Sequence, residues 1–236
     1  MSLASRLSAE KCSECGYRES RPFCNLPPEL LESFSILGKH VVYSDGVTLF
    51  EEGQKAAGVF IICSGHLKLS ASSSEGRTMI LKIAAPGTLL GLGAILNDQM
   101  HEVTAETIEP CELKFIRRTE FMTFWESSGE VSRRTARMLA QEYNDLLLDA
   151  RRRALSGSAT GRFAQLLLDW AEASSCGKPE LRLTMALTHE ELASMVGASR
   201  ETVTRLLNQF ERDGMIERRG SALLILNAPA MRACVK

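Results

Sequence analysis

The sequence predicts an α+β protein: an antiparallel β-barrel or jelly roll, then one long helix, then a winged helix-turn-helix. Short strand-like segments separated by glycines run from about residue 41 to residue 116, and this spacing is typical of barrels and jelly rolls. Apolar residues then recur at helical spacing from about residue 130 to residue 154. Two short amphipathic helices joined by a tight turn follow between residues 187 and 213, and a hairpin pattern comes after them.

Length and composition limit the class of protein. The chain has 236 residues, of which 44% are hydrophobic and 24% are charged, as in a soluble globular protein of one or two domains. Its net charge of −1 counts against a strong non-specific nucleic-acid binder. A specific binder is still allowed, because a few placed groups supply its phosphate contacts. No apolar run reaches the length of a membrane span and the N-terminus lacks the apolar core of a signal peptide, so we expect a cytoplasmic protein with no membrane partner.

Four segments follow from these patterns. Residues 1–25 form a polar tail that carries cysteines, and residues 26–128 hold the strand-like segments. Residues 129–156 form the long helix, and residues 157–236 form the C-terminal domain. Ser156-Gly157-Ser158 breaks the helix, and we expect a hinge there because glycine loosens the backbone.

The C-terminal pattern begins with two capped helices. A first helix is expected at Thr188–Met195, where the opening threonine and Glu191 three residues later form a capping-box pattern. Gly197 can take the positive φ of the tight turn that follows. A second helix is expected at Ser199–Asp213, with its serine as N-cap. Apolar residues of the two helices face each other, so the pair is predicted to be a helix-turn-helix.

The residues that the second helix leaves exposed indicate what the motif binds. Arg200, Glu201, Thr204 and Arg205 lie off the apolar stripe near the N-terminal end, where this motif reaches base edges in the DNA major groove. Arginine can form two bonds to guanine, and glutamate can accept from cytosine. The alternative is a solvated helix face with an intrahelical pair between Glu201 and Arg205. We favour DNA binding, because the turn, the cap and both helix faces agree with it.

A hairpin is expected after the second helix, at Met215–Ile225, with Gly220-Ser221 at its turn. Arginines flank this turn, where they can touch phosphates as a wing. The predicted DNA-binding residues are Ser199, Arg200, Glu201, Thr204, Arg205, Arg218 and Arg219.

The motif sequence resembles a known family. VGASRETVTRLL at residues 196–207 and GRFAQLLL at residues 161–168 are similar to segments of the CRP/FNR superfamily of bacterial transcription regulators. SRETV followed by an arginine resembles the cAMP receptor protein branch more than the FNR branch. The resemblance implies a cyclic-nucleotide-binding-like sensor domain at residues 26–128 and a homodimer on a palindromic operator with half-sites related to TGTGA. It also implies RNA polymerase as a partner.

The long helix carries a seam of apolar residues. Their spacing of three and four residues is that of a coiled coil about two heptads long. The resemblance places the dimerisation helix here, and two-fold symmetry would double the DNA site onto a palindrome. The alternative is a helix packed on its own domain. The predicted dimer residues are Ala136, Leu139, Tyr143, Leu146 and Ala150.

The expected effector pocket differs in chemistry from that of the family. The resemblance implies a glutamate that holds the ribose of cAMP and an Arg-Ser pair that holds its cyclic phosphate. After Gly91, this chain has Leu92 at the glutamate position and His101-Glu102 at the Arg-Ser position. A buried phosphate needs a positive partner, and Glu102 would repel it. We therefore expect no tight cAMP binding and a redox or oxygen signal or an unidentified effector instead, with a cyclic-nucleotide-like ligand and no redox role as the alternative.

Seven cysteines in a chain expected to be cytoplasmic indicate reduced thiols, metal ligands or redox sensors rather than structural disulfides. Cys12, Cys15 and Cys24, with Cys111 far downstream, resemble the FNR arrangement, which implies a [4Fe–4S] cluster on four thiolates. Three alternatives stay open: zinc with His40 as a conceivable fourth ligand, a disulfide switch between the first two thiols, and an unreactive tail. Cys24 also lies beside Phe23 and Leu26 at an apolar junction, where a buried structural cysteine is common. For Cys111 the resemblance leaves another reading open, because the cAMP-binding branch can also carry a cysteine near this position.

No enzyme motif accompanies these features. The chain has no nucleophile elbow, P-loop or metalloprotease pattern. A thiol redox enzyme would place CxxC at a strand-to-helix junction, whereas here it lies in a polar tail. A ligand-binding module that uses the helix-turn-helix only for protein contacts is disfavoured by the exposed Arg200 and Arg205. Cys63, in the apolar segment VFIICSG, is expected in the core.

Overall fold

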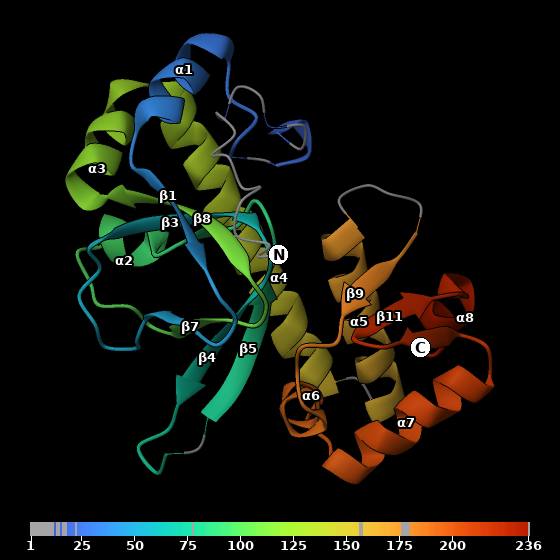
Figure 1. The fold of residues 1–236 in the computed structure, drawn as a ribbon. Helices are drawn as coiled ribbons and strands as arrows, with labels where there is room; N and C mark the ends of the chain where they lie inside the picture. Colours follow the sequence, from blue (N-terminus) through green and yellow to red (C-terminus); the bar gives the residue numbers. More distant parts are fainter. Residues whose placement is uncertain are drawn as a thin grey trace.

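The N-terminal and C-terminal halves of the chain fold as two domains joined by one long helix. Figure 1 shows the β-rich N-terminal domain beside the smaller helical C-terminal domain. The α+β architecture expected from the sequence is confirmed. Ser156 and Gly157 of the expected hinge lie outside the described residues, as does most of the expected tail. The computed structural model describes residues 12, 15, 18–21, 23–76, 78–155, 158–175 and 180–235.

The N-terminal domain is a jelly roll of two antiparallel sheets. Within the described residues, the two sheets have the strand orders β1-β8-β3-β6 and β2-β7-β4-β5. Tight turns join the strands, and Gly65 supplies the positive φ of 81° that the turn between β3 and β4 requires. The strands are β1 Lys39–Tyr43, β2 Thr48–Phe50, β3 Gly58–Ser64, β4 Leu67–Ser72, β5 Thr78–Ala84, β6 Leu89–Leu90, β7 Thr104–Thr107 and β8 Cys111–Arg117.

Two hydrophobic cores lie on the two faces of strand β3, because successive side chains of a strand point to opposite sides. Ile62 points between the sheets and packs in a cluster with Phe50 and Leu113. Ile61 points to the other face and packs in a second cluster, which includes Phe23. Three helices contribute side chains to this second cluster: α1 Pro28–Ile36, α2 Leu92–Leu96 and α3 Arg118–Ser127. The 3-10 turn η2 Arg18–Ser20 comes shortly before Phe23 in the chain.

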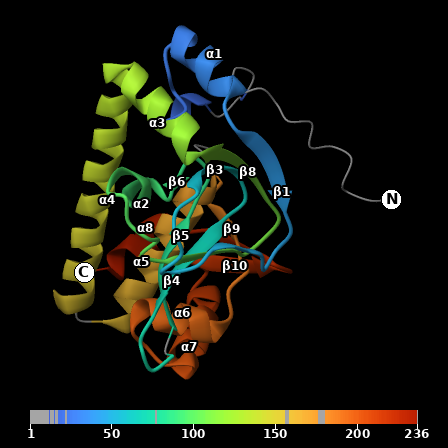
Figure 2. The ribbon, with the colours of Figure 1, turned by 90° about the vertical axis from the view of Figure 1, so that its left-hand side faces the viewer.

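Helix α4, Gly129–Leu155, is the long helix, and it runs along one side of the jelly roll toward the C-terminal domain (Figure 2). Its 27 residues span about 40 Å at about 1.5 Å per residue. Val131 near its N-terminal end is fully buried in the second core cluster of the jelly roll. Among the helices that the structure describes, none combines the length and the apolar character that crossing a membrane requires.

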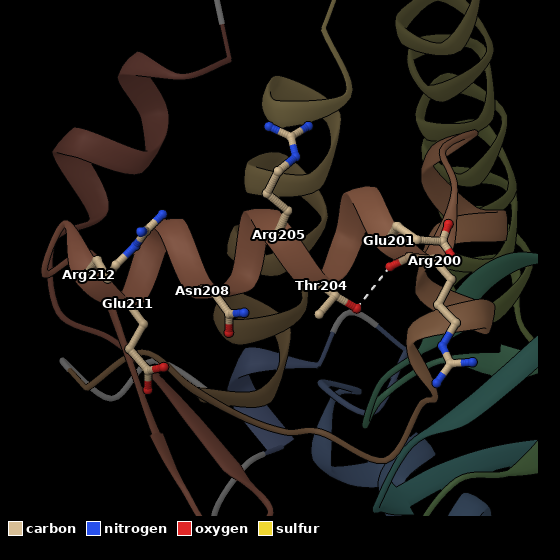
Figure 3. A pocket seen from close by; sticks show the side chains of 7 residues that line it. All are labelled: Arg200, Glu201, Thr204, Arg205, Asn208, Glu211 and Arg212. Carbon is tan, nitrogen blue, oxygen red and sulfur yellow. Dashed lines mark hydrogen bonds between the residues drawn. The ribbon is translucent and has the colours of Figure 1, made fainter.

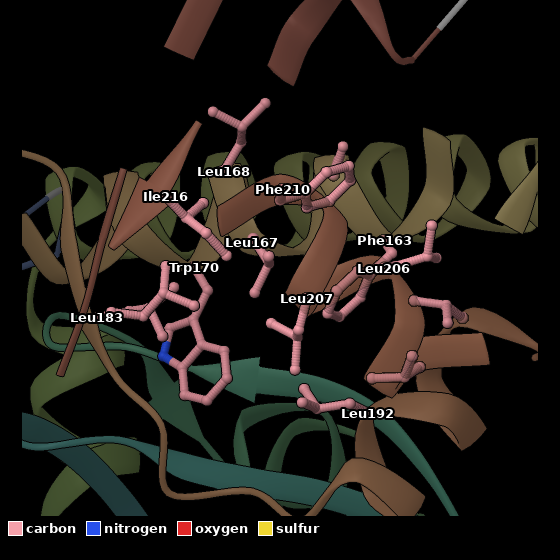
Figure 4. Close-up of a cluster of buried hydrophobic side chains, with 14 of the residues drawn as sticks. Phe163, Leu167, Leu168, Trp170, Leu183, Leu192, Leu206, Leu207, Phe210 and Ile216 are labelled. Atoms are coloured by element: carbon pink, nitrogen blue, oxygen red, sulfur yellow. The ribbon is translucent and has the colours of Figure 1, made fainter. Parts of the chain in front are cut away.

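The C-terminal domain is a winged helix-turn-helix. Strands β10 and β11 form the expected hairpin, and β9 joins β11 as a third strand that the sequence patterns did not indicate. Figure 4 shows Phe163 and Trp170 of α5 gathered with Leu207 and Phe210 of α7 in the core of this domain. Its described elements are α5 Ala159–Ser175, β9 Arg182–Thr184, α6 His189–Val196, α7 Arg200–Arg212, β10 Ile216–Arg219, β11 Ala222–Ile225 and α8 Ala228–Ala233.

The two domains contact each other through the β4–β5 hairpin and helix α6. Lys68 Nζ on β4 lies 2.9 Å from Glu191 Oε1 on α6 and 3.0 Å from Glu106 Oε1 on β7. Ile80 on β5 belongs to the hydrophobic core of the C-terminal domain. The helix-turn-helix is therefore docked against the jelly roll of its own chain.

Glu191 serves this contact as a carboxylate. Burial raises the pKa of its carboxyl, but hydrogen bonds from Thr188 and Lys68 outweigh burial, so the net pKa lies below the ordinary value. A carboxyl group whose pKa is lower in the folded state than in the unfolded state stabilises the folded protein at pH values above the unfolded pKa. That contribution is lost as the pH falls through the folded pKa of Glu191.

We expect Glu191→Gln to weaken the domain contact without removing the helix cap, because glutamine also serves at the third position of a capping box. The free energy of unfolding at neutral pH should fall by up to about 1 kcal/mol, as for a partly exposed ion pair. The difference from the wild type should shrink in acid, where Glu191 is protonated. Urea unfolding at both pH values measures this effect, with the exposed neighbour Glu190→Gln as the matched control. Equal effects of the two exchanges would show that the charge of Glu191 has no part in the contact.

Candidate nucleic-acid interface

The turn between α6 and α7 is fixed by local hydrogen bonds. Thr188 Oγ1 accepts from Glu191 N at 3.2 Å, and Glu191 Oε2 accepts from Thr188 N at 2.8 Å, so the predicted capping box is confirmed. Gly197 ends α6 in the left-handed conformation, with φ of 59°. Ser199 Oγ then accepts from Thr202 N at 3.2 Å and caps α7. These bonds hold the start of α7 in place.

Helix α7 is oriented by its apolar face. Phe210 stacks against Phe163 of α5, with ring centroids 6.0 Å apart and planes inclined by 11°. An apolar stripe at this spacing turns the opposite face of the helix toward solvent. The residues of the buried stripe, each at most 1% exposed, are Val203, Leu206, Leu207 and Phe210.

The exposed face of α7 carries the residues predicted to reach base edges. Figure 3 shows these side chains along one side of the helix. Asn208, Glu211 and Arg212 continue the same face and were missed by the sequence prediction, although they follow Thr204 at helical spacings of three and four residues. The whole face consists of Arg200, Glu201, Thr204, Arg205, Asn208, Glu211 and Arg212.

Glu201 and Arg205 do not form the intrahelical pair that was the alternative reading of this face. The carboxylate of Glu201 accepts hydrogen bonds from its own backbone N–H and from the Ser199 hydroxyl, and these bonds lower its pKa. Within the described residues, Arg205 has no hydrogen bond or ion pair, and Figure 3 shows it projecting from the helix. Its guanidinium is therefore available to an acceptor outside the chain.

The wing arginines are held differently. Arg218 Nε donates to Glu211 Oε2 at 3.1 Å, and its Nη2 donates to Asn208 Oδ1 at 3.0 Å. Arg219 donates to both carboxylate oxygens of Glu217, at 2.7 Å and 2.8 Å. The two residues predicted to touch phosphates are therefore paired with acidic or polar side chains here, and a phosphate contact would require them to exchange partners.

Comparison with known proteins identifies the family. The model of the cyclic nucleotide-binding domain matches residues 40–128, and that of the Crp-like helix-turn-helix domain matches residues 161–234. The CRP-like cAMP-activated global transcriptional regulator of Mycobacterium tuberculosis is 30% identical over 209 residues, which cover 86% of this chain and 91% of that protein. The chain belongs to the CRP/FNR superfamily of transcription regulators.

Two further comparisons agree with this membership. The nitrogen fixation regulation protein FixK of Bradyrhizobium diazoefficiens is 28% identical, covering 87% of this chain and 85% of that protein. The solved structure of FixK2 from Bradyrhizobium japonicum matches with a TM-score of 0.75 at 19% identity, covering 85% of this chain and 98% of that chain. That likeness establishes the fold alone. Only one of these names mentions cAMP, so membership of the CRP/FNR superfamily leaves the signal open.

The predicted effector residues of this CRP/FNR chain do not form one pocket. Gly91 has a φ of 79°, and a Cβ there would lie 3.1 Å from Cε1 of His101. His101 stacks on Phe50 with centroids 3.7 Å apart, and burial lowers its pKa, so the imidazole is held neutral. Leu92 is buried in the core, whereas Glu102 is exposed. The structure thus brings Gly91 and His101 together, whereas the side chain of Leu92 enters the core and that of Glu102 is exposed.

A cavity of about 520 Å³ lies between the jelly roll and α4. Leu92 is the only one of the four predicted effector residues that lines it, as far as the described residues show. Lys82 of β5 and Arg134 and Arg137 of α4 also line the cavity, together with Glu142 and Asp145 of α4. Lys82 Nζ lies 3.6 Å from Glu142 Oε1.

The predicted dimer seam is largely uncovered in the single chain. Tyr143 is 61% exposed and Leu146 is 51% exposed, and the neighbouring Leu147 is 51% exposed as well. Ala136 and Ala150 are also exposed, whereas the half-buried Leu139 packs against the jelly-roll core. The C-terminal half of α4 therefore presents an apolar surface that its own chain does not cover.

The predicted cysteine set is divided by the fold. Cys12, Cys15 and Cys24 lie beside Arg21 and Lys114, whereas Cys111 is buried in the cluster between the sheets. Cys63 was expected in the core but is only half-buried.

The structure shows no ready-made metal centre at these cysteines. In the part of the chain that the structure describes, no group of three or more His, Cys, Asp or Glu side chains is arranged to hold a metal ion. His40, the conceivable zinc ligand, instead has its Nδ1 3.0 Å from Glu112 Oε1.

Replacing Arg205 by alanine should weaken binding to the preferred DNA site by about 1–3 kcal/mol and relax the base preference at one position. The physical reason is the loss of a guanidinium that can form two bonds to one guanine. Fluorescence anisotropy with labelled duplexes measures both effects. Arg232→Ala is the matched control, because Arg232 is an exposed arginine on α8 that pairs with Glu172 away from α7. Equal affinity of the two variants for the best site would show that Arg205 does not read bases.

Calorimetric titration with cAMP is expected to show no binding in the micromolar range. At the two positions that the resemblance assigns to the cyclic phosphate, the neutral His101 and the exposed Glu102 offer no positive partner. The Mycobacterium tuberculosis relative, whose name describes it as cAMP-activated, serves as the positive control for the assay. Micromolar or tighter binding of cAMP to this chain would contradict the expectation.

Proposed function

We propose that this protein is a homodimeric, sequence-specific transcription regulator that binds a palindromic operator and responds to a redox or oxygen signal or to an effector other than cAMP. The observation that carries this proposal is the exposed face of α7, on which Arg205 has no partner within the described residues. Capping and burial hold this face in one orientation, as base reading requires. We expect half-sites related to TGTGA, and RNA polymerase as the partner at promoters.

Dimerisation is supported by the apolar surface of α4. Tyr143, Leu146 and Leu147 are each more than half exposed, which is costly for large apolar side chains in water. A second copy of α4 would cover them as a short coiled coil. Because one recognition helix reads only a few base pairs, a two-fold dimer gives the site length that specificity needs.

The alternative signal is a small molecule of cyclic-nucleotide-like chemistry. The cavity of about 520 Å³ between the jelly roll and α4 supports this candidate. Its walls carry Lys82, Arg134 and Arg137 and also Glu142 and Asp145, so a ligand there would meet donors and acceptors of both charges. A ligand there would touch the dimerisation helix directly and would need no redox chemistry.

Selection of binding sites from random duplex DNA tests the proposed function. We expect enrichment of two-fold symmetric sites with half-sites about one helical turn apart. Leu146→Glu should give a monomer in analytical ultracentrifugation and lose affinity for the symmetric site, because a charge would be buried at the seam. Leu226→Glu is the matched control, since Leu226 is 56% exposed in the DNA-binding domain. Failure to enrich any site would contradict DNA reading, and a dimeric Leu146→Glu variant would contradict the seam.

A further inference from the structure

We propose that His189 is a DNA-binding residue whose contact depends on a proton. Nδ1 of its imidazole holds Thr204 of helix α7, and Nε2 donates to a DNA phosphate only when the ring is protonated. Operator binding therefore takes up a proton and strengthens as the pH falls. The proposal rests on the proposed function and adds to it a residue outside the exposed face of α7.

His189 joins the two helices of the helix-turn-helix. It is the first residue of α6 and is half-buried. Its Nδ1 lies 2.8 Å from Oγ1 of Thr204. Because Thr204 belongs to the exposed face of α7, this bond connects the start of α6 to the residues predicted to read bases.

The bonds of Thr204 decide which nitrogen of His189 carries a hydrogen. A hydroxyl has one hydrogen to donate, and Oγ1 of Thr204 donates it to the carbonyl oxygen of Arg200 at 2.9 Å, one turn earlier in α7 (Figure 3). The hydroxyl must therefore accept from His189, so Nδ1 carries a hydrogen. A neutral imidazole has a single N–H, and Nε2 of the neutral ring is consequently a bare acceptor.

Nε2 of His189 is available to a ligand. Within the part of the chain that the structure describes, Nε2 makes no hydrogen bond or ion pair. In a helix-turn-helix bound to DNA the first helix crosses the backbone while the second lies in the major groove. The start of α6, beside Thr204, therefore lies where phosphates pass.

A phosphate distinguishes the two states of this ring. The oxygens of a phosphodiester accept hydrogen bonds and do not donate them, so the bare Nε2 of the neutral ring offers them nothing. Protonation of Nε2 supplies both a hydrogen and a positive charge, and a charge-assisted bond of this kind is stronger than a neutral one. The bond to Thr204 is kept in both states, because Nδ1 donates in both.

The charges around the start of α6 nearly balance. Arg200 on α7 disfavours a positive ring, whereas Glu190, beside His189 on α6, favours one. Glu191 is already paired with Lys68 of the jelly roll, 2.9 Å away. On α5 and β5, which also pack against α6, the charged side chains at the domain contact have partners of their own: Arg162 at Val196 O, Asp169 at Gln165 and Lys82 at Glu142. A phosphate would add the negative charge that favours the protonated ring.

The first experiment compares operator affinity at pH 6 and pH 8, because histidine side chains change charge in this range. Fluorescence anisotropy at constant ionic strength measures the Kd of the full-length wild-type protein for the selected symmetric site. We expect tighter binding at pH 6. The gain is limited to about tenfold per pH unit for each protomer, because each takes up at most one proton.

Two exchanges of His189 separate the proton from the fold. In His189→Asn the amide nitrogen can replace Nδ1 at Thr204 but cannot gain a charge, so binding should be weaker at pH 6 and the difference between the two pH values should shrink. His189→Arg carries a permanent charge and should bind tightly at both pH values. His40→Asn, in the jelly roll, is the matched control and should keep the wild-type pH dependence. Equal pH dependence of the wild type and His189→Asn would overturn the proposal.

The salt dependence of binding reports the phosphate contact itself. Each additional phosphate contact steepens the slope of log Kd against log salt concentration by about 0.9. The wild-type slope should therefore be steeper at pH 6 than at pH 8, and that of His189→Asn should be the same at both. A wild-type slope that does not change with pH would contradict a proton-dependent phosphate contact.

NMR of the free protein tests the ring without DNA. Nitrogen-15 shifts of the histidine side chains at pH 8, with the His189 signal assigned by its absence in His189→Asn, should show hydrogen on Nδ1 and a bare Nε2. Hydrogen on Nε2 instead would overturn the proposal. A protein that binds no duplex at either pH would overturn the proposed function together with this contact, whereas tight binding that does not vary with pH would overturn the contact alone.

Discussion

Burial of one face of α7 is the constraint on which the rest of the molecule depends. A helix has 3.6 residues per turn, so an apolar stripe packed into the core leaves the opposite face to solvent. Four side chains of α7 are at most 1% exposed, and the same packing that stabilises the C-terminal domain therefore holds Arg200 and Arg205 outward. The exposed face is a consequence of the core, and substitutions in the core would disturb DNA binding without touching any base contact.

Local patterns made the helix-turn-helix predictable, because each of its features depends on neighbours within four residues. The capping box of Thr188, the turn at Gly197 and the cap of α7 could all be read in this way. Three other features could not be predicted from local patterns: the pairing of Arg218 with Glu211, the strand β9, and the separation of Cys111 from Cys12. Each of these depends on segments that only the folded chain brings together, and spacing along the sequence carries no information about them.

Glu191 shows how a local feature acquires a second role in the fold. Its carboxylate completes the cap of α6 and also meets Lys68 of the jelly roll. A change that pulls Lys68 away would therefore act on the first turn of the helix that supports α7. This contact links the jelly roll to the helix-turn-helix, since the two hydrogen-bonding roles share one side chain.

Positive charge occurs at some candidate sensing sites of the jelly roll and not at others. Beside α2, burial keeps His101 neutral, so the place where a cyclic phosphate would need a cation has none. Beneath the N-terminal segment, Lys114 and Arg21 are buried next to thiols. Burial of a cation is costly, and Lys114 offsets part of that cost by donating to Ser35 O and by lying over the ring of Phe34, whose centroid is 5.0 Å from its Nζ. Basic side chains also line the cavity between the jelly roll and α4, together with Glu142 and Asp145, so buried or half-buried cations occur at both places.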